Sequence, residues 1–90
     1  MNSPEIKKFI HEHRDLFWYT PEEEKEEISL AVVVETILNY GSLESIKKLF
    51  KLIGIKKASE IFKVQINNKR NNYFLPVKNF FELYFKRHAQ

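Results

Sequence analysis

The chain has 90 residues, 43% of them hydrophobic and 30% charged, which is enough for one compact domain and too short for several. It contains no cysteine, so disulfides, a thiolate nucleophile and metal sites with cysteine ligands are excluded. The net charge of +3 is unevenly distributed along the chain. Residues 1–40 hold four basic and nine acidic side chains, whereas residues 41–90 hold eleven basic and three acidic side chains. This asymmetry bears on binding partners rather than on the fold.

The first predicted helix begins at Pro4. Ser3 is a suitable N-cap, and a proline at the first helical position loses no hydrogen bond. The apolar face that follows has the spacing of one helical stripe and comprises Ile6, Phe9, Ile10, His13 and Phe17. We expect Leu16, Phe17 and Trp18 to form an aromatic cluster before the next break in the chain.

A second helix is signalled at Thr20. A threonine cap, Pro21 at the first helical position and Glu23 three residues after the cap together form a capping box. Because Ser29 is also suited to cap a helix, the segment either runs unbroken to Tyr40 or begins again after Ser29.

Two glycines are expected to end helices. Residues 30–38 include three valines of high strand propensity, but their apolar positions match helical spacing better, and Gly41 then supplies a left-handed C-terminal stop. Ser42 opens the next helix and Gly54 closes it. The apolar faces on the two sides of this second glycine are Ile46, Leu49, Phe50 and Ile53, and then Ala58, Ile61 and Phe62, running to about Ile66.

The C-terminal part contains a loop and the strongest helical stripe. Residues 67–72 include four asparagines and no apolar side chain, which predicts a surface loop. Pro76 biases Leu75 toward an extended conformation and opens the last helix. Its stripe is Val77, Phe80, Phe81, Tyr84 and Phe85. The sequence therefore predicts an all-α fold, a single compact bundle of five or six short helices over residues 1–90.

No catalytic or metal-binding motif stands out. His11 and His13 are two residues apart on a helix and point about 200° away from one another, so with Glu12 they do not close on one ion. His13 is expected to be partly buried and hydrogen-bonded. The acidic residues 22–27 crowd the exposed first turns of a predicted helix rather than a cleft. Glycine-rich phosphate loops and nucleophile elbows are absent, so we expect neither an enzyme nor a cofactor.

The helices around Gly54 have the lengths of a helix-turn-helix pair. The second helix and the loop after it carry five candidate nucleic-acid-binding residues, Lys56, Lys57, Lys63, Lys69 and Arg70. The pair is atypical, because the position four residues before the glycine is small in the common motif and is Phe50 here. A ring at this position is expected to wedge the two helices apart.

Four aromatic residues fall outside the clearest stripes. They are Phe17, Trp18, Tyr73 and Phe74. One interpretation places them in the core. The other makes them an exposed patch for a partner protein, since aromatic side chains are enriched at the centres of interfaces.

Four landmarks together resemble a known family. They are Leu-Phe-Trp at 16–18, Ile-Leu-Asn-Tyr-Gly-Ser-Leu-Glu at 37–44, the helix pair around Gly54, and Asn-Phe-Phe-Glu-Leu-Tyr-Phe at 79–85. This pattern is similar to an uncharacterised family of short all-helical bacterial proteins. The chain departs from it at Tyr19, where an aspartate is common, and in its asparagine-rich loop.

The resemblance implies a role but no active residue. Members of the family are often encoded beside nucleotidyltransferase-type toxins of abortive infection, which implies an antitoxin or accessory function. Three hypotheses follow: a non-enzymatic adaptor that binds a partner protein, such as that toxin; a small DNA-binding transcriptional regulator; and a protein that self-associates head to tail. The chain has no apolar stretch of signal-peptide or membrane-spanning length, so we expect a cytoplasmic protein without a membrane partner.

Overall fold

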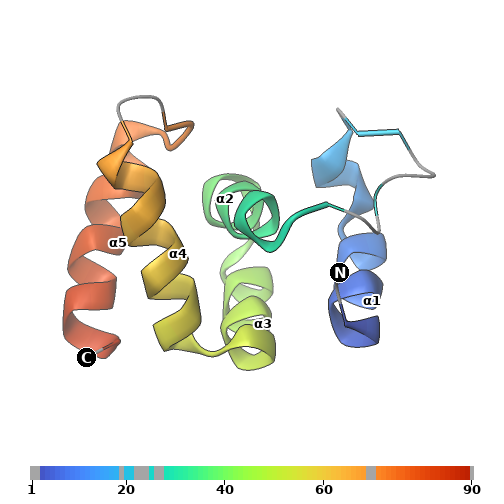
Figure 1. The fold of residues 1–90 in the computed structure, drawn as a ribbon, viewed down its shortest axis with the longest axis horizontal. Coiled ribbons are helices and arrows are strands. Elements are labelled where there is room, and N and C mark those ends of the chain that lie inside the picture. Colours follow the sequence, from blue (N-terminus) through green and yellow to red (C-terminus); the bar gives the residue numbers. More distant parts are fainter. Residues whose placement is uncertain (1–2, 19, 22–24, 26–27, 69–70, 90) are drawn as a thin grey trace.

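Five α-helices and one short 3₁₀-helix form this computed structural model, which describes residues 3–18, 20–21, 25, 28–68 and 71–89 (Figure 1). The elements are α1 (Pro4–Glu12), the 3₁₀-helix η1 (Arg14–Phe17), α2 (Leu30–Tyr40), α3 (Leu43–Ile53), α4 (Ile55–Asn67) and α5 (Leu75–His88). The described residues contain no strand. The prediction of an all-α bundle of short helices is confirmed.

Serine side chains begin three of the helices. The hydroxyls of Ser3, Ser29 and Ser42 each accept a hydrogen bond from the backbone N–H three residues later, at 3.3, 3.3 and 3.1 Å. Ser29 itself has extended backbone angles, so α2 begins after it, and a helix unbroken from Pro21 to Tyr40 is excluded. The capping box predicted at Thr20 depends on Glu23, which lies outside the described residues.

Three local predictions need correction. The first α-helix ends at Glu12, and Phe17 reaches the core from η1 rather than from one continuous helical face. Gly41 has φ −75° and ψ 160°, so the stop after α2 is extended and not left-handed. A Cβ atom at Gly41 would lie 2.7 Å from the carbonyl oxygen of Ile37, which is the physical reason for a glycine there. The last helix includes Leu75, and the extended residue is Phe74.

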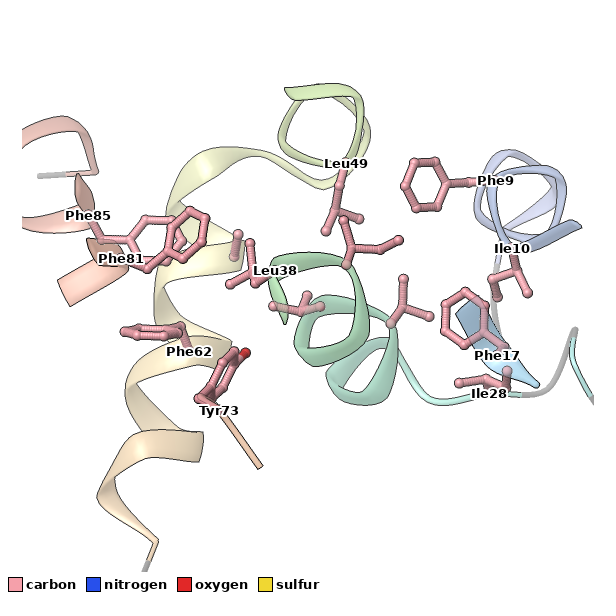
Figure 2. Close-up of a cluster of buried hydrophobic side chains, with 14 residues drawn as sticks. Phe9, Ile10, Phe17, Ile28, Leu38, Leu49, Phe62, Tyr73, Phe81 and Phe85 are labelled. Carbon is pink, nitrogen blue, oxygen red and sulfur yellow. The ribbon is translucent and has the colours of Figure 1, made fainter. Parts of the chain in front are cut away.

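Helix α2 lies at the centre of the bundle. Figure 1 shows it end-on between α1 at one end of the long axis and the pair α4–α5 at the other. It packs against η1, α3 and α4. Its buried aliphatic side chains join two aromatic groups of the core, Phe9 and Phe17 near α1, and Phe62 and Phe81 near α5 (Figure 2).

The ring of Phe62 contacts three other rings in the aromatic group at the α5 end of the core. Its centroid lies 5.0 Å from that of Tyr73, 6.3 Å from Phe81 and 5.3 Å from Phe85. Phe50 of α3 also contacts α5, with ring centroids 6.4 and 5.5 Å from Phe81 and Phe85. The expectation that Phe50 wedges α3 and α4 apart is therefore corrected, because this ring joins α3 to α5 while α3 and α4 pack together.

Side-chain hydrogen bonds attach the described part of the asparagine-rich loop to α2. Asn39 donates to the carbonyl oxygen of Asn72 at 3.0 Å and accepts from the Phe74 N–H at 3.3 Å. Asn72 donates to a Glu35 carboxylate oxygen at 3.1 Å. On the other side, the Tyr73 hydroxyl donates to a Gln65 oxygen at 2.6 Å. The segment that leads into α5 is thus fixed by specific contacts.

The buried Tyr73 hydroxyl should make the protein sensitive to alkaline pH. Burial, and then the Glu35 carboxylate, raise the pKa of Tyr73 above its ordinary value of about 10. The folded state therefore keeps a proton that the unfolded state releases, and the free energy of unfolding should fall by up to ~1.4 kcal/mol per pH unit above that value.

Urea unfolding between pH 9 and 11 measures this effect. Tyr73→Phe should flatten the alkaline decline, whereas Tyr40→Phe, which alters an exposed tyrosine, should not change it. An equally steep decline in Tyr73→Phe would assign the effect to other groups.

Candidate partner-binding surface

The outer side of α5 exposes large apolar side chains. Phe80 is 57% exposed and Leu83 is 54% exposed, although Phe81 and Phe85 on the opposite side of the helix are buried. Residues 80, 83 and 84 are neighbours on one helical face because they are three and four positions apart. We call Phe80, Leu83 and Tyr84 the α5 ridge.

Aromatic stacking connects the ridge to the core. The ring of Tyr84 stacks with those of Phe80 and Phe50, with centroid distances of 5.9 Å to each and interplanar angles of 21° and 28°. Phe50 in turn contacts the buried rings of α5. The exposed end of the stack is therefore supported by the core and has little freedom to change conformation.

Positive charge accompanies the ridge. Lys47 lies one turn before Phe50 on α3, and Arg87 lies one turn after Leu83 on α5. Both side chains are exposed, as is Lys51 one turn after Lys47. Residues 43–88 carry nine described basic side chains, and their acidic side chains are Glu44, Glu60 and Glu82.

The acidic side chains of these helices lie away from the ridge or are paired. Glu82 is 3.5 Å from the Lys78 ammonium, in a pair spaced four residues apart. Glu44 lines a small open pocket on the α1 side of α3, together with Glu12 and Lys48. Glu60 is exposed on α4, one helical turn from both Lys56 and Lys63. The ridge therefore has a cationic border.

The predicted aromatic patch does not form as one surface. Phe17 and Tyr73 are buried, so the core accounts for them and their prediction as docking residues is corrected. Trp18 is 80% exposed and follows η1. Phe74 is exposed at the start of α5, where its ring meets that of Tyr40 edge-on at 5.4 Å. In Figure 1 these two segments lie toward opposite ends of the long axis.

Sequence reasoning missed the ridge because it placed Phe80 in the buried stripe. One signal was available: Leu83 lies outside that stripe, so α5 carries apolar side chains on more than one face.

The three predicted nucleic-acid-binding lysines of α4 are exposed but do not all share one face. Lys56 and Lys63 are seven residues apart on α4 and lie on the same side, whereas Lys57 is about 100° around the helix. Lys69 and Arg70 lie outside the described residues. A single residue, Gly54, joins α3 to α4, in place of the turn of three or four residues found in helix-turn-helix proteins.

His13 connects α1 to α3. Its Nδ1 atom donates to the Phe9 carbonyl oxygen at 2.8 Å, and Nε2 lies 2.7 Å from the Ser45 hydroxyl, which in the neutral ring is the donor. The prediction of a partly buried, hydrogen-bonded histidine is confirmed.

Nearby, the Lys48 ammonium bonded to Glu12 at 2.8 Å lowers the pKa of that carboxyl. The described residues include no group of three side chains able to hold a metal ion.

The described residues of the N-terminal half do not carry an excess of acidic side chains. The described residues of 3–40 include four basic side chains and four acidic ones, and the acidic ones are Glu5, Glu12, Asp15 and Glu35. The other acidic side chains of this half are the glutamates at 22–24 and 26–27, outside the described residues. Within the described residues, the charge asymmetry therefore arises from α3, α4 and α5.

Comparisons of the chain with family models, with curated proteins and with solved structures give no match. Over the described part of the chain, no helix has both the length and the apolar character needed to cross a bilayer.

Proposed function

We propose that this chain is a non-enzymatic, antitoxin-like adaptor that binds a partner protein through the α5 ridge. The observation that carries the proposal is the pair of exposed side chains, Phe80 and Leu83, on a helix whose inner side is anchored in the core. Supported aromatic and aliphatic side chains of this kind are typical of the energetic centres of protein interfaces. The antitoxin role rests on the resemblance of residues 16–86 to a family encoded beside nucleotidyltransferase-type toxins.

A protein partner is favoured over duplex DNA for two reasons. The basic residues of α4 are divided between two sides of the helix, and the connection at Gly54 is too short for the usual recognition pair. The ridge on α5 instead exposes two large apolar side chains within one helical turn, and the burial of apolar surface favours association with a protein rather than contact with phosphates.

Co-expression with the product of a neighbouring toxin gene tests the proposal. We expect the toxin to co-purify with the unaltered chain and with Val64→Ser, which removes an exposed apolar side chain from α4. The double variant Phe80→Ser with Leu83→Ser should lose the partner while keeping its helical circular-dichroism spectrum. Absence of co-purification, or equal recovery with the double variant, would contradict the adaptor function through this ridge.

A further inference from the structure

We propose that the partner segment bound by the α5 ridge is an acidic amphipathic helix, an inference that rests on the adaptor function proposed above. Such a segment would place apolar side chains at helical spacing against Phe80 and Leu83. Its aspartate and glutamate side chains would lie beside the cationic border formed by Lys47, Lys51 and Arg87. This is the helix-against-apolar-surface mode of peptide recognition with an added charge requirement.

The ridge has the shape and order that this mode needs. Its side chains lie on two successive turns of α5, so they present apolar contacts along a line parallel to the helix axis. The stack of Phe80 on Tyr84, with centroids 5.9 Å apart, fixes the outermost ring before any partner arrives. A partner therefore meets a surface that loses little side-chain entropy on binding.

Charge selects an acidic partner over a basic or neutral one. Arg87 lies on the ridge side of α5, and Lys47 lies on α3 one turn before Phe50, whose ring stacks with Tyr84. The acidic residue nearest in sequence, Glu82, is engaged by Lys78. Opposite charge on a partner would speed encounter, whereas a basic partner would be repelled. The same argument disfavours a second copy of α5, because an isologous contact through the ridge would bring the exposed basic residues of the two copies together.

The stack also argues against single-stranded nucleic acid as the occupant. Bases bind aromatic side chains face to face. The Tyr84 ring is already engaged in stacking with Phe80 and with Phe50. Leu83, the other exposed member of the ridge, has no ring to stack on. The surface therefore suits aliphatic and aromatic side chains of a protein better than bases.

Binding of designed peptides tests the inference without knowledge of the natural partner. The probe is an 18-residue amphipathic helix with leucines on one face and glutamates elsewhere. Its controls are a twin with lysine at every glutamate position and a scrambled peptide of the same acidic composition. By titration calorimetry we expect the acidic amphipathic peptide to bind at least tenfold more tightly than either control, and to weaken as salt rises.

Matched variants locate the site. Phe80→Ser with Leu83→Ser should weaken the acidic peptide at least tenfold, and so should Lys51→Glu with Arg87→Glu. As controls on exposed positions of α4, Val64→Ser removes an apolar side chain and Lys56→Glu with Lys57→Glu reverses two charges, and these variants should leave the affinity unchanged. Should a ridge variant fail to fold, amide shifts of the unaltered protein provide the second measurement. Shifts centred on residues 80–87 support the inference, and shifts confined to other helices overturn it.

Other occupants have distinct outcomes. Equal affinity for the lysine twin would overturn the charge requirement. Self-association in light scattering that Phe80→Ser with Leu83→Ser abolishes would make the occupant a second copy. Phe80-dependent binding of a twelve-residue oligothymidylate would make it single-stranded nucleic acid. Recovery of a toxin through the ridge without preference for the acidic peptide would overturn this inference and leave the adaptor function standing.

Discussion

Replacement of Phe62 by alanine should lower the free energy of unfolding by about 3–5 kcal/mol. The side chain is 1% exposed, and its ring contacts those of Tyr73, Phe81 and Phe85. Truncation would remove the buried ring and leave a cavity where α4, α5 and the segment before α5 meet. Because domains of this size are stable by only about 5–15 kcal/mol, the loss would be a large part of the total.

Thermal and urea unfolding measure this loss. For a chain of this length each kcal/mol lowers the melting temperature by about 4–8 °C, so the decrease should exceed ~10 °C. Val64→Ala on the same helix is the control, and because Val64 is largely exposed its effect should stay within about 0.5 kcal/mol. A loss below ~1 kcal/mol for Phe62→Ala would show that the α5 end of the core does not depend on this ring.

The parts of the fold that the sequence predicted correctly depend on local chemistry. Ser3 and Ser42 cap helices because a hydroxyl three residues before a free N–H needs no distant partner. Gly54 ends α3 for an equally local reason, since its φ of 87° disfavours any side chain. Gly41 was predicted to act in the same way, but its reason is the approach of the Ile37 carbonyl and not the sign of φ.

The division between core and surface depended on neighbours that the sequence does not specify. Periodicity places Phe80 and Phe81 together in one stripe, yet only Phe81 is buried. Helix α5 lies at one end of the bundle beside α4 (Figure 1), and α3 contacts it through Phe50. These neighbours cover only part of its circumference. A stripe wider than the covering helices must leave one edge exposed, and that edge is the candidate binding surface. The same dependence on tertiary packing buried Phe17 and Tyr73 and left Trp18 exposed.

Replacement of Gly54 by alanine should destabilise the protein by about 1–3 kcal/mol through backbone strain. The residue has φ 87° and ψ 140° and is the whole connection between α3 and α4. Its N–H donates to the Phe50 carbonyl oxygen at 2.8 Å, and its own carbonyl oxygen accepts from Ala58 at 3.1 Å. These bonds to both helices oppose any relaxation of the angles.

Two further substitutions identify the cause of this loss. Beyond its neighbours in the chain, a Cβ atom at Gly54 would meet no atom within 4 Å, so a clash with the rest of the molecule does not contribute and Gly54→Ser should cost as much as alanine. Asparagine tolerates the left-handed helical region, near φ +57° and ψ +47°, but the ψ of Gly54 is far from it. Gly54→Asn should therefore give no rescue in urea unfolding. Recovery of most of the stability by asparagine would mean that the connection adopts a left-handed helical residue in solution, with a different angle between α3 and α4.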